Sequence, residues 1–466
     1  MIAALPAIMR QVLKFSDKYY DFWIKTDIMK IQDILQRLKI ESLNKMQYQA
    51  GDVLVNTDSD LVILSATGSG KTLAYLLPLV GMLNPESDRV QAVVVVPGRE
   101  LALQSHDVFS RMACGLRSMP LYGGRAAMDE HKNLRKVRPQ IVFATPGRLN
   151  DHLDKGNIDA DGIKYLVIDE FDKCLKMGFH EEMSALIDKL PYVERRVLLS
   201  ATDANEIPGF VNMGRVVRLD FLTDEQIPER INLFVVKSKE KDKLDVLNAL
   251  LCSFGVSSSI VFLNYRDAVE RVADYLRSKG FVVSAFHGGL DQKAREDAIY
   301  KFSNGSSSVL VGTDLAARGL DIPDVDNIIH YHLPQGEDEY IHRVGRTGRW
   351  EACGRAFLLL GPEETIPEYI KDMPDEYVLP NDIETPPQPK MVTLYIGKGK
   401  KDKISKGDVL GFLCKIGGLK GNDIGRIDVK ERCSYAAVSR EKLKSVLTKT
   451  SGEKLKGIKT IVELIK

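Results

Sequence analysis

The sequence has few cysteines, and none of them stands in a spacing that builds a site. No C-x-x-C pair occurs, which argues against both a structural zinc site and a disulfide framework. We therefore expect buried free thiols at Cys114, Cys174, Cys252, Cys353, Cys414 and Cys433.

Long hydrophobic runs are also missing. No apolar run approaches about 18 residues, so no membrane span is expected. Residues 2–9 are apolar, but no basic segment precedes them and no small-residue cleavage site follows, so they make a poor signal peptide. We predict a cytoplasmic protein without membrane contact, and a chain of 466 residues predicts several domains.

The whole chain has a net charge of only +1, but two parts of it are strongly charged with opposite signs. Residues 388–466 hold 19 Lys and Arg against 8 Asp and Glu, a formal charge of +11. The remainder holds 46 against 56, a charge of −10. Positive charge gathered in this way is typical of modules that bind phosphate backbones, and an ordinary solvated surface is the alternative.

Short, β-branched apolar runs separated by helix-length segments predict buried parallel strands. They occur at residues 61–64, 92–96, 141–143, 166–168 and 197–199, and the same rhythm restarts after residue 220 at 259–263, 282–286, 308–311 and 327–330. We expect two α/β domains in tandem, each a doubly wound parallel sheet. Prolines then recur between residues 362 and 389, and we interpret residues 366–388 as a linker.

The basic C-terminal part predicts a β-α-β-β-α-β order, with strands at 392–396, 424–429, 435–438 and 460–465 and helices at 406–416 and 441–447. This is the order of an RNA-recognition-motif fold. The aromatic signature of the classical version is absent, so Tyr395 and Tyr435 could stack bases or pack in the core. We place RNA contacts first on the basic loop, at Lys398, Lys400, Lys401, Lys403 and Lys406.

Residues 65–72 read SATGSGKT and indicate a phosphate-binding loop. Glycines let backbone N–H groups close around phosphate oxygens, while a lysine reaches the β and γ phosphates and a hydroxyl reaches Mg²⁺. The apolar run before the loop and the helical pattern after it supply the strand and helix that the motif requires.

A second apolar strand ends in three carboxylates, Asp169, Glu170 and Asp172. The end of a strand is where α/β sheets place ligand chemistry. One carboxylate can hold Mg²⁺ and the next can orient the attacking water, because the metal offsets their mutual repulsion. Far along the chain, residues 342–349 read HRVGRTGR, and such arginines can stabilise a transferring phosphoryl group.

These motifs together resemble DEAD-box RNA helicases. The resemblance spans residues 38–361 and includes DEFD at 169–172, SAT at 200–202, PGRELA at 97–102, TPGR at 145–148 and HRVGRTGR. Residues 396–401, 407–411 and 423–427 resemble the C-terminal domain of DbpA-type helicases. The resemblance implies two RecA-like domains, ATP and Mg²⁺ as ligands, and RNA as partner.

The resemblance also implies a role for each matching residue. Nucleotide binding would use Gln47, Ala66, Thr67, Gly68, Ser69, Gly70, Lys71, Thr72 and Asp321. Catalysis would use Lys71, Asp169, Glu170, Arg346 and Arg349, with Thr72 and Asp169 at the metal. Coupling of the nucleotide to domain closure would use Asp172, Ser200, Thr202 and His342. RNA would contact Arg99, Gly123, Gly124, Thr145, Arg148, Asn264, His287, Gly288, Gln292, Arg295, Thr313 and Arg318.

Several positions depart from the family pattern. Phe171 replaces an alanine, which could alter the spacing between Asp172 and residues 200–202. Residues 43–44, Leu-Asn, replace the usual proline and threonine before Gln47, and Lys30 stands where an aromatic is usual, so strict preference for ATP is less secure. Gly98 replaces a threonine, and His332 replaces an aspartate with no consequence that the sequence reveals.

The resulting expectation is a monomeric RNA-dependent ATPase that unwinds short RNA duplexes locally. The resemblance implies that residues 389–466 target it to large-subunit ribosomal RNA during ribosome assembly. The expected domains are an N-terminal extension (1–28), two helicase domains (29–220 and 221–365), the linker and the RNA-binding domain (389–466). Two alternatives stay open: an ATP-gated RNA clamp with negligible turnover, and a DNA helicase on the same core.

Overall fold

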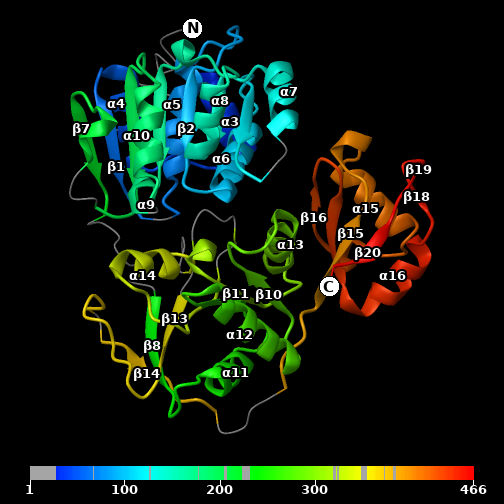
Figure 1. Cartoon of the computed structure of the whole chain (residues 1–466). Coiled ribbons are helices and arrows are strands. Elements are labelled where there is room, and N and C mark those ends of the chain that lie inside the picture. The colour runs from blue at the N-terminus through cyan, green and yellow to red at the C-terminus, as the bar shows by residue number, and fades with distance from the viewer. Residues whose placement is uncertain are drawn as a thin grey trace, which may run out of the picture. The chain divides into compact units, whose positions relative to one another are not determined.

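Figure 1 shows the computed structural model of the chain, with two helix-covered parallel sheets and a smaller C-terminal sheet. The structure describes residues 28–465 except 67, 125–126, 177, 204–206, 223–230, 318–321, 323–324, 348–353, 372 and 381–384. The chain divides into two compact units, residues 1–226 and 227–466.

The first unit holds a seven-stranded parallel sheet. Its strands lie in the order β3-β4-β2-β5-β6-β1-β7. Their bounds are β1 (Asp60–Leu64), β2 (Ala92–Val95), β3 (Ser118–Leu121), β4 (Ile141–Ala144), β5 (Tyr165–Asp169), β6 (Arg195–Ser200) and β7 (Val216–Asp220). All five runs predicted as strands in this domain are present.

Helices cover both faces of this sheet because successive strand side chains point to opposite sides. Leu61 and Ile63 enter one core, together with α3 (Ile28–Leu38), α4 (Lys45–Asn56), α5 (Lys71–Met82) and α6 (Arg99–Met112). Val62 and Leu64 enter the other, together with α7 (Ala127–Val137), α8 (Pro146–Asp154), α9 (Phe171–Lys176) and α10 (His180–Asp188).

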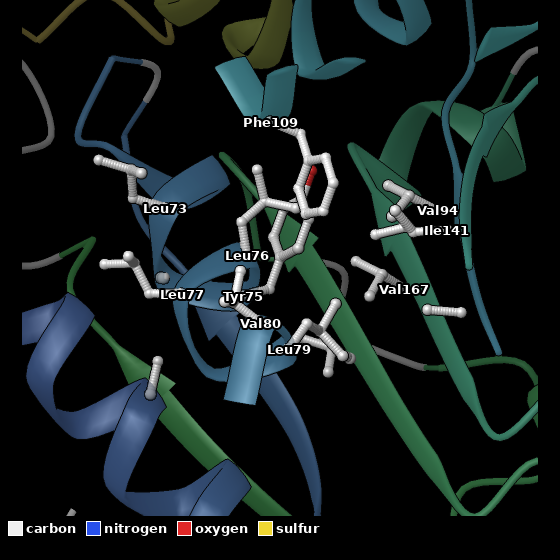
Figure 2. Close-up of a cluster of buried hydrophobic side chains, with 14 of the residues drawn as sticks. Leu73, Tyr75, Leu76, Leu77, Leu79, Val80, Val94, Phe109, Ile141 and Val167 are labelled. Carbon is white, nitrogen blue, oxygen red and sulfur yellow. The ribbon is translucent and has the colours of Figure 1, made fainter. Parts of the chain in front are cut away.

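The first of these cores holds helix α5 firmly behind the predicted phosphate loop. Figure 2 shows Tyr75, Leu76, Leu79 and Val80 of α5 beside Phe109 and the strand residues Val94, Ile141 and Val167. Tyr75 and Leu76 have no exposed surface. Burial of a large apolar side chain contributes about 1.5–3 kcal/mol, so the helix that begins at the loop is well anchored.

The second unit repeats the doubly wound plan. The order of its sheet is β10-β11-β9-β12-β13-β8-β14, and all its pairs are parallel. The strands are β8 (Ile231–Lys237), β9 (Ser259–Phe262), β10 (Val283–Phe286), β11 (Val309–Gly312), β12 (Asn327–His330), β13 (Gly354–Leu360) and β14 (Asp375–Glu376). Helices α11 (Leu244–Ser253) and α12 (Arg266–Ser278) cover one face, and α13 (Gln292–Ser303) and α14 (Glu337–Val344) cover the other.

Five strands go beyond those that the apolar runs predict. β3 and β7 are edge strands with half-exposed alternation, and β3 contains Pro120, which an edge tolerates. β8 and β13 are apolar segments like the predicted strands, but the sequence prediction does not include them. β14 lies inside the range predicted as linker, and Tyr377 and Leu379 after it pack against the core, so part of residues 366–388 extends the second sheet.

The C-terminal domain has the predicted β-α-β-β-α-β order. Its antiparallel sheet runs β16-β17-β15-β20. The elements are β15 (Met391–Ile396), α15 (Lys406–Lys415), β16 (Ile424–Val429), β17 (Ser434–Ser439), α16 (Leu443–Thr450) and β20 (Val462–Leu464), with a small hairpin of β18 (Lys454–Leu455) and β19 (Ile458–Lys459) before the last strand. Within the described chain, no helix is both long enough and apolar enough to cross a membrane.

Candidate nucleotide and RNA sites

The predicted phosphate loop joins β1 to α5. Gly70 is the N-cap of α5 with φ of +88°, a left-handed conformation that glycine adopts without strain. A Cβ at Gly70 would overlap the amide nitrogen of Gln47, so a larger residue here would displace that side chain. The loop therefore presents its backbone at the start of a helix, which suits phosphate. Thr67 lies outside the described residues.

Lys71 points back into this loop. Its ammonium group contacts the carbonyl oxygens of Ser65 and Ala66, the latter at 2.9 Å. Burial lowers the pKa of Lys71 to about 8, although the nearby carboxylates of Asp169 and Glu170 oppose the shift. Conversely, burial and Glu170 raise the pKa of Asp169 to about 6. The lysine and the strand-end carboxylates therefore share one electrostatic site.

The segment before α4 is tied to the same loop. Asn44 and Gln47 form a reciprocal capping box, and the side-chain amide of Gln47 donates to the carbonyl of Gly70 at 3.1 Å. The amide of Asn44 donates to the carbonyl of Ser69 at 2.8 Å. Prediction from the sequence missed Asn44, although Asn followed three residues later by Gln is a capping-box pattern. Asn44 thus caps the helix and also contacts the loop.

The acidic residues follow β5 directly. Asp169 is buried, and Glu170 has φ of +53°, an uncommon conformation for a non-glycine residue. Its carboxylate lies 2.6 Å from the ammonium group of the buried Lys173. Strain of this kind persists where the surrounding structure holds it, and here it turns the chain between the strand and α9.

Three of the four predicted coupling residues, Asp172, Ser200 and Thr202, lie together at the carboxyl ends of β5 and β6. The hydroxyl of Thr202 donates to a carboxylate oxygen of Asp172 at 3.1 Å. The hydroxyl of Ser200 accepts from the backbone N–H of Thr202 at 3.0 Å and donates to its carbonyl at 2.6 Å. All three side chains are buried. Phe171, also buried, does not prevent the contact between Asp172 and Thr202.

The predicted RNA residues of the first domain occupy the other half of the same sheet edge. Arg99 follows β2, Gly123 and Gly124 follow β3, and Thr145 and Arg148 follow β4. These three strands are neighbours, whereas the nucleotide residues follow β1, β5 and β6. Because parallel strands end at one edge, the sheet order separates the predicted nucleotide residues from the predicted RNA residues.

Two of the predicted RNA residues lie against each other. Gly124 has φ of +90°, and a Cβ there would lie 2.9 Å from a guanidinium nitrogen of Arg99. Thr145 is the N-cap of α8, with Pro146 in its first turn. The exposed backbone at Gly123 and Gly124 can approach a ligand closely, because glycine carries no side chain.

The predicted RNA residues of the second domain also follow neighbouring strands. Asn264 follows β9, His287 and Gly288 follow β10, and Thr313 follows β11, and these strands are again neighbours. The imidazole of His287 lies 2.6 Å from a carboxylate oxygen of Glu270. Gln292 and Arg295 lie on the first turns of α13, where Arg295 donates to the carbonyl of Leu290 at 3.2 Å.

Arg343, which prediction from the sequence missed, ties these segments together. Its guanidinium donates to Asp314, to the side-chain oxygen of Asn264 at 2.8 Å and to the carbonyl of His332 at 2.7 Å. The side chain has no exposed surface. His332 also accepts from the backbone N–H of Asn264 through Nδ1 at 3.2 Å, so its ring supports the same segment. Burial and the charge of Lys243 lower the pKa of His332.

The predicted arginines and their coupling histidine are only partly described. His342 lies in the last turn of α14 and is buried. Arg346 lies in the turn after that helix and is also buried. Arg318, Asp321 and Arg349 lie outside the described residues, so their predicted roles have no structural account.

The basic loop of the C-terminal domain is mostly exposed. Lys400, Lys401, Lys403 and Lys406 have exposed side chains. Lys398 differs, because it is half-buried and lies 3.3 Å from a carboxylate oxygen of Asp402. Four of the five predicted lysines therefore present their charge to solvent.

The sheet face of this domain packs on α13 of the second domain. The ring of Tyr435 stacks on Tyr300, with centroids 4.5 Å apart, and its hydroxyl donates to Asp297 at 2.9 Å. Thr393 bonds to Asn304 at 2.8 Å. The predicted alternatives for Tyr435 were base stacking and core packing, and it instead fills a contact between domains. Tyr395, opposite Tyr435 in the sheet, has Lys293 of α13 over its ring.

Family models match three consecutive parts of the chain. Residues 44–207 match the DEAD/DEAH box helicase model and residues 242–351 the helicase conserved C-terminal domain. Residues 393–464 match the DbpA RNA binding domain. The ATP-dependent RNA helicase DbpA of Escherichia coli (strain K12) is 33% identical over 456 residues, covering 93% of this chain and 98% of that protein. The chain belongs to the DEAD-box RNA helicases.

Other relatives agree with this assignment. The DbpA of Bacillus subtilis (strain 168) is 32% identical over 429 residues, which cover 85% of this chain and 90% of that protein. The structure of S. cerevisiae Dbp5 bound to RNA and ADP BeF3 matches with a TM-score of 0.66 and 29% identity, over 71% of this chain and 87% of that one. Mss116 bound to ssRNA and UDP-BeF matches with a TM-score of 0.66 and 27% identity, over 72% and 73%.

As a DEAD-box helicase of the DbpA type, the protein is an RNA-dependent ATPase that binds ATP through its core. The predicted family, fold class and type of enzyme are confirmed. The helicase brings its phosphate loop, strand-end carboxylates and SAT segment together at one half of the first sheet edge. Asn44 and Arg343 are additions that the structure makes to the predicted set.

Proposed function

We propose that this helicase opens short RNA duplexes locally in structured large-subunit ribosomal RNA during ribosome assembly, and that it acts as a cytoplasmic monomer. The observation that carries the proposal is the C-terminal domain. It matches the DbpA RNA binding domain over residues 393–464 and lies in a segment with a formal charge of +11. A domain of this kind is what separates DbpA-type helicases from those that have the core alone.

The nucleotide would lie at β1, β5 and β6 of the first domain. Backbone N–H groups of residues 66–70 would hold the phosphates and Lys71 would reach the β and γ phosphates. Lys71 now contacts carbonyl oxygens of its own loop, so ATP would replace those contacts with phosphate oxygens. Gln47 would read the adenine edge with its side-chain amide, while its contact with Gly70 keeps the loop in place.

The residues around Asp169 fit a magnesium ion. Carboxylate and hydroxyl oxygens are the ligands that Mg²⁺ prefers, and Asp169 and Thr72 offer one of each beside the phosphate loop. The raised pKa of Asp169 shows a buried carboxylate whose charge a cation would stabilise. When bound, Mg²⁺ neutralises charge on the phosphate oxygens.

Hydrolysis would use Glu170 to orient the attacking water, and Arg346 and Arg349 to stabilise charge on the transferring phosphoryl group. The bond between Thr202 and Asp172 would pass the state of the nucleotide to Ser200 and the segment after β6. His342 on α14 and Asp321 would complete the set from the second domain. Domain closure on ATP and RNA would assemble these groups, and hydrolysis would release them.

RNA would cross the β2-β3-β4 half of the first sheet edge and the β9-β10-β11 half of the second. Exposed glycine backbone, a threonine N-cap and arginines favour contact with phosphate and ribose, so core binding should tolerate many sequences and weaken with salt. Arg318 would extend this surface. The contact of Tyr435 with Tyr300 covers part of the C-terminal sheet, which favours RNA binding through the exposed lysines of residues 400–406.

Steady-state ATP hydrolysis tests the targeting role. The full chain and a truncation ending at Pro387 are compared at fixed salt, with ribosomal RNA, unrelated structured RNA and single-stranded DNA as activators. We expect ribosomal RNA to activate the full chain at the lowest concentration and the truncation to lose that preference. Equal activation of both proteins by every RNA would overturn the ribosomal assignment and leave the core assignment intact.

Two further measurements test the alternatives. Strand release from a short duplex is expected with ATP, and multiple turnovers are expected only when ATP can be hydrolysed. An ATP-gated clamp would bind the duplex under ATP without turnover. A DNA helicase would be activated by single-stranded DNA as well as by RNA, whereas we expect 2′-hydroxyl contacts to make RNA the better activator.

A further inference from the structure

A buried ion pair lies behind the RNA half of the first sheet edge. Glu130 of α7 accepts a hydrogen bond from Nε of Arg148 on α8, with a distance of 2.6 Å. The two side chains are only 3% and 13% exposed. Glu130 lies outside the motifs that the sequence shows.

A second bond holds the same carboxylate in place. His152, one helical turn after Arg148 and fully buried, lies with Nε2 3.1 Å from the same oxygen of Glu130. Burial acts to raise the pKa of Glu130, but the bonds from His152 and Arg148 bring it below its ordinary value. The carboxylate is therefore ionised at neutral pH and faces the guanidinium as a full charge.

Glu130 connects two segments of the chain that carry proposed RNA-binding residues. Helix α7 follows Gly123 and Gly124, and α8 begins directly after Thr145. The ion pair therefore ties the chain after β3 to the chain after β4. The carboxylate of Asp151 lies 3.5 Å from Nη1 of Arg148, so the bond to Glu130 is the shorter of the two, and Asp151 is also the more exposed carboxylate.

A contact at Nε fixes the plane of a guanidinium group and so sets the direction of its terminal nitrogens. An arginine held in this way before RNA arrives loses less side-chain freedom on binding. We propose that Glu130 is a positioning residue for RNA binding, which holds Arg148 in the orientation that contacts the RNA backbone. This inference rests on the proposed RNA role of Arg148.

Glu130→Gln in the full chain tests the inference, because it keeps the shape and an accepting oxygen but removes the charge. We expect the RNA concentration for half-maximal ATP hydrolysis to rise about fivefold, a typical size for coupled neighbours. The turnover number at saturating RNA and the KM for ATP should each change less than twofold. Asp107→Asn is the control, since it removes a carboxylate from an exposed ion pair with Arg111 in the same domain.

The double variant separates positioning from stability. Arg148→Ala alone should raise the half-saturating RNA concentration, and Glu130→Gln should add less than twofold in that background. Effects that multiply would show that Glu130 acts independently of Arg148, and would overturn the inference. A fall in turnover and in Tm with unchanged RNA dependence would assign Glu130 to stability alone, which also overturns it.

The same variants distinguish a failure of the positioning role of Glu130 from a failure of the RNA role of Arg148. If Arg148→Ala weakens RNA binding but Glu130→Gln does not, only the positioning role of Glu130 falls. If Arg148→Ala leaves the RNA dependence unchanged, the RNA role of Arg148 falls and the inference about Glu130 falls with it.

Discussion

The buried Arg343 and the partly exposed Asp314 form a bidentate ion pair in the second domain, with Nε to Oδ1 at 2.6 Å and Nη2 to Oδ2 at 3.0 Å. The same guanidinium bonds to Asn264 and to the carbonyl of His332. A planar fork of donors can satisfy three segments at once, which a lysine cannot do. Arg343 therefore holds together the ends of β9, β11 and β12, and RNA residues are proposed at the ends of β9 and β11.

Arg343→Lys should destabilise the second domain by about 3 kcal/mol, because the lysine ammonium cannot reproduce all the bonds that the buried guanidinium makes and leaves polar groups around it without a partner. The free energy of unfolding from urea titration measures the effect, and RNA-stimulated ATP hydrolysis should fall with it. Arg277→Lys is the matched control, since Arg277 pairs with Asp274 on an exposed helix face. That change should cost under about 0.5 kcal/mol. Equal losses for the two variants would contradict the role given to Arg343.

Gly70→Ala should weaken ATP binding more than it weakens the fold. The φ of +88° disfavours alanine, and the added Cβ would push Gln47 away from the loop. We expect the KM for ATP to rise on the order of tenfold, which corresponds to about 1.4 kcal/mol. Gly115→Ala provides the control, because Gly115 has φ of +86° but no described atom within 4 Å of the new Cβ. Gly115→Ala should leave the KM for ATP unchanged, and an unchanged KM in Gly70→Ala as well would contradict the role given to Gly70.

Sequence patterns predict where the phosphate loop and the carboxylates lie, because each of these patterns is local. The loop at 65–72 and the carboxylates at 169–172 each follow a buried strand, and that context is visible in the sequence. The contacts of Arg343 with Asn264 and Asp314 join residues far apart in the chain, and no local pattern indicates them. The strand β14 is missed for a similar reason, since two exposed acidic residues form a strand only because β8 offers a free edge.

The aromatic residues of the C-terminal domain illustrate the same limit. The sequence leaves base stacking and core packing open for Tyr435, and the structure instead places its ring against Tyr300 of α13. What covers this face of the sheet depends on α13, where residues 293, 297, 300 and 304 share one side of the helix. Gln292 and Arg295 lie on a different side. One helix thus carries proposed RNA residues and the contact with the C-terminal domain.

Tyr435→Ala should release the C-terminal domain from α13. It removes the stacked ring on Tyr300 and the hydrogen bond to Asp297, together worth about 1–3 kcal/mol. Limited proteolysis between residues 381 and 388 should become faster. Tyr435→Phe keeps the ring and should show a smaller effect. Unchanged proteolysis in the alanine variant would contradict a docked domain in solution.

His330 should make the stability of the second domain depend on pH. It has no exposed surface, and no described residue gives its ring nitrogens a hydrogen-bond partner. Its neighbours are the rings of Tyr340 and Phe262, with centroids 5.5 and 6.5 Å away, and the charged Arg343. Burial and Arg343 hold the pKa of His330 well below its ordinary value of 6.5.

The sign follows from where the proton binds. Below pH 6.5 the unfolded chain protonates His330 but the folded chain does not, so the unfolded state gains stability as the pH falls. Between pH 7.5 and 5.5 this group alone should lower the free energy of unfolding by about 1.4 kcal/mol. His330→Leu removes the titrating group. The free energies of unfolding from urea titrations at the two pH values should therefore lie closer together in the variant than in the unmodified protein, by about 1.4 kcal/mol. An unchanged pH dependence in the variant would show that His330 is protonated in the folded protein as readily as in the unfolded chain.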